Sequence, residues 1–146
     1  MVVGLDKAID EIVNNAQNLL GKNTVIVVSS DNGGSTWFGG LNAPFRSGKQ
    51  TPFEGGVRVP AFAIDLSNDG KYLGLDGREF KKLFHISDWL PTFISWAGNS
   101  HLLKDVKTDG VDQSKVLIIL HLKQPTKINK RLLWIFRFKE WYHFRH

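Results

Sequence analysis

Cysteine is absent from the 146 residues of this chain, and its absence excludes disulfide bonds, thiolate metal sites and cysteine nucleophiles. Also lacking is any run of roughly 18 apolar residues, the length that a transmembrane helix requires. The N-terminus has no basic flank followed by an apolar stretch, so we expect no signal peptide in this chain. The length and the 42% hydrophobic content fit one globular domain.

The net charge of +5 is concentrated in the C-terminal tail. Residues 1–114 contain 11 Lys and Arg against 13 Asp and Glu, whereas residues 115–146 contain 8 against 1. The composition therefore changes near residue 114, and we divide the chain into 1–114 and a basic, aromatic tail of 115–146.

The first part begins with the pattern of an α/β unit. Apolar residues recur at spacings of three and four from Leu5 to Leu20, which predicts an amphipathic helix that Gly21 closes in a left-handed conformation. The run TVIVVSS (24–30) then reads as a strand that is buried on both faces, as in a parallel sheet between helices.

Further along, glycine and polar residues from Asp31 to Glu54 predict a long functional loop. A second strand is expected from Val57 to Ile64, with Pro60 at an edge or a bulge. The segment HISDWLPTFISWAG (85–98) predicts a short helix, capped by Ser87 or Asp88, with Pro91 in its first turn and Gly98 at its end. We assign Trp89, Leu90 and Phe93 to the core.

Two oxygen-bearing side chains, Asp31 and Asn32, follow the first strand directly. Ligands collect beyond the carboxyl ends of strands in open α/β sheets, and carboxylate and amide oxygens are the ligands that Ca²⁺ and Mg²⁺ prefer. However, Asp-Asn-Gly-Gly is also an ordinary turn, since Asp and Asn bond their own backbone. By itself the motif leaves both interpretations open.

Three cations, Arg46, Lys49 and Arg58, lie on the glycine-rich loop downstream. Cations on such a loop suit a tetrahedral oxyanion such as sulfate or phosphate, although a solvated basic loop explains them equally well.

The segments SSDNGGSTWFGGLNAPFRSGKQTPFEGGVRVPAF, HISDWLPTFISWAG and DGVDQS together resemble the sulfatases, and within them the arylsulfatase B-like branch. The likeness runs from about Leu5 to Ser114 and corresponds to the C-terminal part of the catalytic domain. It implies an alkaline-phosphatase-like α/β fold, with a mixed, largely parallel sheet and flanking helices. It also implies hydrolysis of sulfate esters at a calcium site, and it weakens the alternative of a phosphoesterase from the same superfamily.

Site residues follow from the same resemblance. Asp31 and Asn32 correspond to two calcium ligands, and Lys49 to the lysine that holds the substrate sulfate. For Arg46, Glu54, Arg58 and His85, which also belong to the family pattern, the expected role is loop support. A histidine that opens a helix is more often structural than catalytic.

The family's nucleophile, a formylglycine made from the cysteine of a C-x-P-x-R motif, has no counterpart in this chain. We therefore expect no catalytic nucleophile, poor calcium affinity and no turnover by these residues alone, as in a fragment from a truncated gene model. A strand that is built for burial on both sides predicts exposed strand edges and self-association.

The tail allows two interpretations. Its aromatic and basic residues could bind anionic surfaces, which would make the chain a non-catalytic interaction protein, or the tail could be translated non-coding sequence at a gene-model boundary. The expected partner of the full-length relative is a sulfated small molecule or glycan, and nucleic acid is not expected. The family points to a lysosomal or secreted location.

Overall fold

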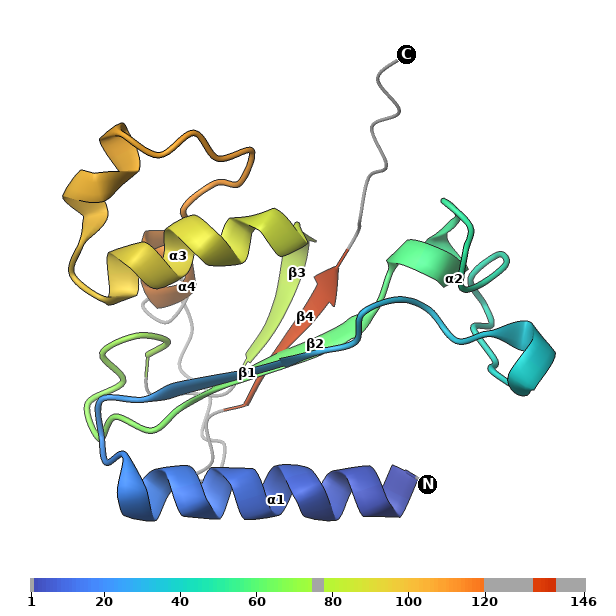
Figure 1. Ribbon diagram of the computed structural model, residues 1–146, viewed down its shortest axis with the longest axis horizontal. Helices are drawn as coiled ribbons and strands as arrows, with labels where there is room; N and C mark the ends of the chain where they lie inside the picture. Colours follow the sequence, from blue (N-terminus) through green and yellow to red (C-terminus); the bar gives the residue numbers. More distant parts are fainter. Residues whose placement is uncertain (1, 75–77, 120–132, 139–146) are drawn as a thin grey trace.

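The computed structural model describes residues 2–74, 78–119 and 133–138 (Figure 1). Its helices and strands are α1 (Val2–Leu19), β1 (Val25–Ser29), α2 (Glu54–Val57), β2 (Pro60–Asp65), β3 (Arg78–Phe84), α3 (Trp89–Trp96), α4 (Ser114–Ile119) and β4 (Leu133–Phe138). Short 3-10 helices cover Thr36–Phe38 (η1), Ile86–Asp88 (η2) and Ser100–Lys104 (η3). Among the described residues, none of the helices combines the length and the apolar character needed to cross a bilayer.

The four strands form one mixed sheet in the order β1-β2-β4-β3. The pairs β1–β2 and β2–β4 are antiparallel, and only β3–β4 is parallel. The α/β class and the mixed sheet agree with the sequence prediction, but parallel pairs do not predominate among the described strands. Because the order depends on β4, a strand of the tail, local sequence patterns could not reveal it.

Helices lie on both faces of this sheet (Figure 1). The helix α1 runs along one face, while α3 and α4 lie on the other. The main core lies between the sheet and α3 with α4. Its buried members are Val59, Ala61, Ala63, Tyr72, Leu73, Phe80, Phe84, Trp89 and Leu117.

The first helix forms as the periodicity predicts, and Gly21 adopts the expected left-handed conformation at φ 70°. Its contact with the sheet is narrow, however, since Ala16 is its one buried residue. Leu5, Ile12 and Leu19, which follow one another at intervals of seven, are exposed. The apolar stripe of α1 is therefore wider than the surface it covers.

The strand β1 differs from its prediction. We expected burial on both faces, but all five residues from Val25 to Ser29 are only half-buried. The reason is position: β1 lies at an end of the strand order, and α1 covers it incompletely.

The second strand starts later than expected, at Pro60 instead of Val57, because Glu54–Val57 forms the helical turn α2. The interpretation of Pro60 as an edge or bulge residue is wrong. It is the first residue of an internal strand, a position that tolerates proline, and its carbonyl still accepts from the Ser30 N–H at 3.1 Å.

The helix α3 follows directly on η2, and its N-cap residue is Asp88, one of the two that we predicted, although Asp88 makes no side-chain cap hydrogen bond to α3. The capping box belongs to η2: Nδ1 of its N-cap residue His85 accepts from the Ser87 N–H, and the Asp88 side chain accepts from the His85 N–H at 3.0 Å. Pro91 lies in the first turn, and Gly98 follows the end with φ 79°, both as predicted.

Of the three residues of this helix that we predicted to lie in the core, one is buried. Trp89 is buried, whereas Leu90 and Phe93 are 53% and 44% exposed. Phe93 still stacks on Trp89, with ring centroids 5.2 Å apart.

Candidate functional site

The residues after β1 form a bend that is held by its own side chains. The Asn32 N–H donates to Oδ1 of Asp31 at 2.9 Å, and the Ser30 hydroxyl donates to the Asn32 carbonyl at 2.9 Å. Asp31 is exposed and Asn32 is half-buried. The Asp31 side chain thus bonds its neighbouring backbone, as in the turn interpretation, while Oδ2 of Asp31 and Oδ1 of Asn32 have no hydrogen-bond partner among the described residues.

Gly33 connects this turn to α2. Its N–H donates to the Gly56 carbonyl at 2.8 Å, and a Cβ atom at Gly33 would lie 1.7 Å from the carbonyl oxygen of Gly55. Only glycine permits so close an approach of the two backbones. The glycines of the D-N-G-G and E-G-G-V-R motifs thus pack against each other although they are 22 positions apart in the chain (33 against 55).

Asn42 holds the loop together from its centre. Its Oδ1 accepts from the Gly34 N–H at 2.8 Å, while its Nδ2 donates to the carbonyls of Gly34 at 2.9 Å and Ser47 at 3.1 Å. We did not single out Asn42 from the sequence. In the sequence, an Asn shortly before a proline indicates only a turn. It does not indicate hydrogen bonds to a residue eight positions earlier.

Lys49 is placed by the same contacts. Its N–H donates at 3.2 Å to the Gly34 carbonyl, which is the carbonyl that Asn42 also binds. Lys49 is exposed. The structure therefore brings the backbone of Lys49 against the segment that follows Asp31 and Asn32.

The remaining charged residues of the loop pack against aromatic rings. The guanidinium carbon of Arg46 lies 3.9 Å from the ring centre of Phe53, and that of Arg58 lies 4.5 Å from the ring centre of Phe45. Arg58 also forms an ion pair with Glu54 at 3.3 Å within one helical turn. These contacts fix the loop and leave the cations in stacked positions.

His85 lies outside this loop, at the start of η2, where its ring caps the helix. The hydroxyl of Ser87 lies 2.7 Å from Nδ1 of His85. Its position in the structure is that of a helix-capping residue.

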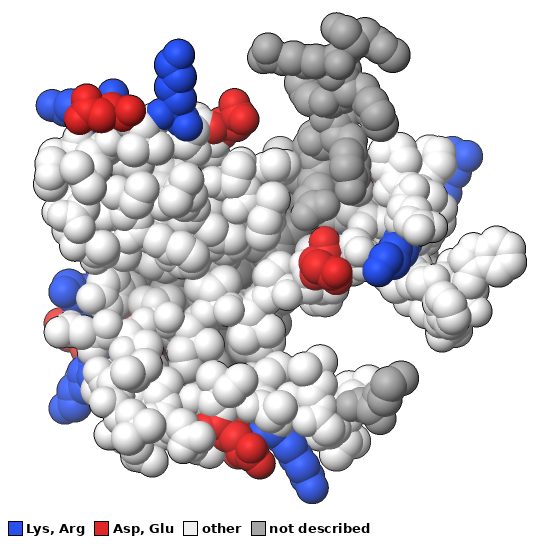
Figure 2. Space-filling view, in the orientation of Figure 1, with Lys and Arg blue, Asp and Glu red and all other residues white. Residues whose placement is uncertain are grey.

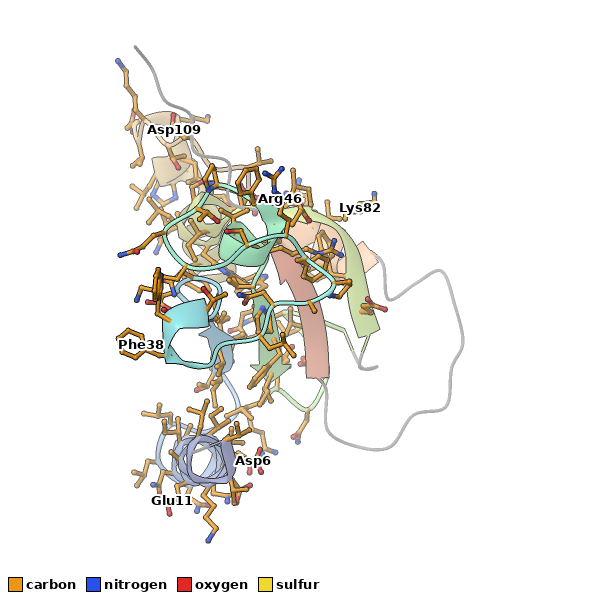
Figure 3. The ribbon with its side chains drawn as sticks, turned by 90° about the vertical axis from the view of Figure 1, so that its right-hand side faces the viewer. Asp6, Glu11, Phe38, Arg46, Lys82 and Asp109 are labelled. Atoms are coloured by element: carbon orange, nitrogen blue, oxygen red, sulfur yellow. The ribbon has the colours of Figure 1, made fainter. Side chains whose placement is uncertain are left out.

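The 3-10 helix η1 presents two exposed aromatic side chains, Trp37 and Phe38. Figure 3 shows Phe38 pointing away from the body of the molecule. The two ends of the segment that carries η1 are joined by a hydrogen bond from the Gly40 N–H to the Ser35 carbonyl at 2.8 Å.

Asp31 and Asn32 fit the chemistry of a hard cation, because a carboxylate and an amide carbonyl are oxygen donors of the kind Ca²⁺ takes. Two donors do not complete the six to eight that calcium takes. Within residues 2–74, 78–119 and 133–138, no group of three or more His, Cys, Asp or Glu residues could hold a metal ion. Asp31 and Asn32 therefore offer two oxygen donors of this kind and no more.

Comparison with known proteins agrees with this set of motifs. A sulfatase family model matches residues 1–99, and the chain belongs to the sulfatase family. The resemblance inferred from the motifs is confirmed. Hydrolysis of sulfate esters is the activity of this family, and an α/β fold of the alkaline-phosphatase type is the architecture it implies.

Individual relatives are similar over much of this chain. Mouse arylsulfatase J is 38% identical over 111 residues, which cover 71% of this chain and 17% of the relative. Rat N-acetylgalactosamine-6-sulfatase is 45% identical over 126 residues, or 81% of this chain and 22% of the relative. Bovine arylsulfatase A is 36% identical over 103 residues, or 68% and 18%.

The chain thus spans about a fifth of the length of these relatives. No solved structure matches the chain significantly.

Proposed function

We propose that this chain is the part of a sulfatase catalytic domain that supplies two calcium ligands, Asp31 and Asn32, and the sulfate-binding amine of Lys49. The complete site would hydrolyse sulfate esters of a sulfated small molecule or glycan. Residues 1–114 carry this function, and the location that goes with it is lysosomal or secreted.

The observation that carries the proposal is the set of backbone contacts centred on Gly34. Its carbonyl receives hydrogen bonds from both the Lys49 N–H and the Asn42 side chain, two residues beyond the proposed metal ligands. The hydrogen bond from Lys49 to Gly34 joins the segment that contains Asp31 and Asn32 to the segment that contains the Lys49 ammonium group. An oxyanion that bridges a metal ion and an ammonium group needs both kinds of segment side by side.

Each residue then has a separate role. Asp31 and Asn32 would hold the calcium ion, which supplies positive charge beside the sulfate oxygens. Lys49, a flexible point charge with three N–H donors, neutralises the sulfate from another direction. Arg46, Glu54 and Arg58 keep the loop in shape through their stacking and ion-pair contacts.

Turnover by this chain alone is not part of the proposal, because the sequence has no cysteine from which the family's nucleophile could be made. Incubation of the chain with a chromogenic aryl sulfate should release no phenol. Calcium binding should also be weak, with a dissociation constant of about 1 mM or higher.

Titration of the isotopically labelled chain with calcium chloride and then sodium sulfate, followed by NMR, tests the proposal. Calcium should shift the amide signals of residues 31–34, and sulfate should then shift those of residues 48–50. Asp31→Asn should weaken the calcium response, with Asp69→Asn as a matched control on an exposed loop.

Lys49→Gln should abolish the sulfate response while the calcium response remains. A calcium response that is equal in Asp31→Asn and the unaltered chain would contradict the assignment of the ligands. A sulfate response that survives in Lys49→Gln would contradict the assignment of the lysine.

For the alternative, a non-catalytic protein whose tail binds anionic surfaces, the structure offers no supporting observation. Within the tail, Leu133–Phe138 forms the internal strand β4, between β2 and β3. The other residues of the tail to which this alternative refers, 120–132 and 139–146, lie outside the described residues.

A further inference from the structure

The segment that follows β1 is joined to the glycine-rich loop at two neighbouring residues, and each joins it to a different part. The Gly33 N–H donates to the Gly56 carbonyl at 2.8 Å, which connects the segment to α2. Gly34 instead meets the residues around Lys49, through the Asn42 side chain and through the Lys49 N–H. The position of Lys49 relative to the proposed calcium ligands therefore depends on the second connection.

Asn42 forms this second connection with both polar atoms of its side chain. Its Oδ1 accepts from the Gly34 N–H at 2.8 Å, and its Nδ2 donates to the carbonyls of Gly34 at 2.9 Å and Ser47 at 3.1 Å. Because Asn42 binds both the N–H and the carbonyl of Gly34, it fixes the orientation of that backbone. The Gly34 carbonyl also accepts from the Lys49 N–H at 3.2 Å, since a carbonyl oxygen has two lone pairs.

The backbone around Lys49 requires such support. Ser47, two residues before Lys49, and Gln50, one residue after it, have φ values of 65° and 71°. Left-handed backbone is uncommon for residues other than glycine, and it persists where neighbouring contacts hold it. Asn42 holds the Ser47 carbonyl. The intervening Gly48 packs directly against Asn42, because a Cβ atom there would lie 2.5 Å from Nδ2.

The density of charge does not by itself define an anion site in this region. On the face drawn in Figure 2, a few basic and acidic side chains lie around α2 among uncharged surface. Arg46 and Arg58 stack on aromatic rings, with distances of 3.9 and 4.5 Å from the guanidinium carbon to the ring centre. Anion binding therefore depends on where the ammonium group of Lys49 is placed.

We infer that Asn42 is the positioning residue of the proposed site and that it couples the binding of calcium and sulfate. The inference rests on the proposed function. Asn42 holds Gly34, two residues after Asn32, and Ser47, two residues before Lys49. An anion gains affinity from both a metal ion and an ammonium group only where their distance is fixed before it binds. All of these residues lie inside the stretch that the sulfatase family model matches.

Titration of the full chain with calcium chloride and methyl sulfate, a soluble sulfate ester, followed by NMR, tests the coupling. In the unaltered chain, saturating calcium should lower the dissociation constant of methyl sulfate by about fivefold or more. In Asn42→Ala this ratio should fall to about one, while the dissociation constant of calcium alone changes by less than about twofold. Asn14→Ala, which removes an exposed amide on α1, is the matched control and should keep the full ratio.

Hydrogen exchange of the ligand-free chain adds a measurement that requires neither ligand. The Lys49 amide should exchange about tenfold faster in Asn42→Ala, because the carbonyl that it binds is no longer held. The Gly33 amide, which belongs to the other connection, should keep its rate. Asn42→Asp has nearly the same size but cannot donate to the two carbonyls, so the Lys49 amide should exchange faster in this variant as well.

Coupling that is absent from the unaltered chain while both ligands bind would overturn the inference, as would coupling that persists in Asn42→Ala. An unchanged exchange rate of the Lys49 amide in both variants would overturn it too. Loss of the circular dichroism of the folded chain in both variants would also count against it, because Asn42 would then support the whole molecule.

Failure of the proposed function has a different signature. It appears in the unaltered chain as the absence of any calcium response, or in Lys49→Gln as a sulfate response that survives, and the inference falls with it. The Asn42 variants alone decide the inference when those two results are as expected.

Discussion

At the scale of single residues, the most consequential side chains are buried carboxylates that bind backbone N–H groups. Asp65, at the end of β2, is 4% exposed and accepts from the N–H groups of Ser67 at 2.8 Å, Tyr72 at 2.9 Å and Leu73 at 3.0 Å. It organises the turn after the strand, because a carboxyl group with three N–H donors has its own hydrogen bonds satisfied and satisfies those of the loop. Composition and periodicity gave no indication of this role.

Asp65→Ala should destabilise the chain by about 3 kcal/mol, because three N–H groups lose their acceptor and all three donors belong to buried residues. Urea unfolding followed by circular dichroism measures the change. Asp69→Ala is the matched control: Asp69 is exposed and, among the described residues, accepts only from the Lys71 N–H, so its loss should cost about 0.5 kcal/mol. Equal losses in the two variants would show that Asp65 does not organise the turn.

A second carboxylate makes stability depend on pH. Burial raises the pKa of Asp112, but hydrogen bonds from the Ser95 hydroxyl and from Ser114, together with the charge of Lys115, outweigh it and lower the pKa below 3.8. A carboxyl group whose pKa is lower in the folded state stabilises the fold above its unfolded pKa, and this stabilisation disappears as pH falls through the folded pKa.

The unaltered chain should therefore be more stable than Asp112→Asn at neutral pH, and the difference should shrink as pH falls below 3.8. Denaturant unfolding at a series of pH values measures both curves. Ser95→Ala removes the hydroxyl that donates to Asp112, so its free energy of unfolding should fall less as the pH is lowered. A difference that stays constant down to strongly acidic pH would contradict the prediction.

At the scale of elements, the chain depends on contacts between segments that the sequence separates widely. Asp88 connects η2 to residues 109–114, since its Oδ1 accepts from the Val111 N–H at 2.8 Å while its Oδ2 accepts from His85. Gly110 lies against the Ser87 carbonyl, where a Cβ atom would come within 2.1 Å. The H-I-S-D-W-L-P-T and D-G-V-D-Q-S motifs thus belong to one packed unit.

The glycine contact between the end of β1 and α2 allows the sharpest test at this scale. Gly33→Ala should destabilise the chain by about 3 kcal/mol, because the new Cβ would overlap the backbone carbonyl of Gly55. It should also displace Asn32 from its turn. Gly4→Ala is the control: nothing lies within 4 Å of a Cβ there, and alanine in α1 should stabilise by about 1 kcal/mol. Thermal unfolding of both variants would test these opposite signs.

Local signals predicted those elements whose limits are set by their own residues. Gly21 ends α1 and Gly98 follows α3 because left-handed backbone favours glycine, and both were found from the sequence. The position of β1 at an edge, the late start of β2 and the place of β4 inside the sheet depend on pairing between distant segments. Likewise, the motifs pointed to Asp31, Asn32 and Lys49 as candidate site residues. The hydrogen bonds by which Asn42 and Lys49 both meet the Gly34 carbonyl became visible only in the structure.

At the scale of the whole molecule, packing is uneven between the two faces of the sheet. The aromatic core on the α3 side brings Trp89 within 4.5 Å of Phe84 between ring centroids, and Phe80 meets Phe84 edge to face at 5.8 Å. On the opposite face, α1 buries only Ala16. The free energy that holds α1 to the sheet is therefore much smaller than the free energy that holds α3.

Urea should consequently release α1 before the core unfolds. Far-ultraviolet circular dichroism, which follows helix, should begin to fall at lower urea than a signal from the core tryptophans, and the m value should lie below that of a two-state domain of this length. Hydrogen exchange should show the amides of α1 opening at lower free energy than those of β2. Ala16→Gly should move the first transition alone, because Ala16 is the one residue of α1 that is buried. Coincident transitions with a full-size m value would show that α1 and the core unfold as one cooperative unit, and that the half-covered face of the sheet is bound more tightly than its burial indicates.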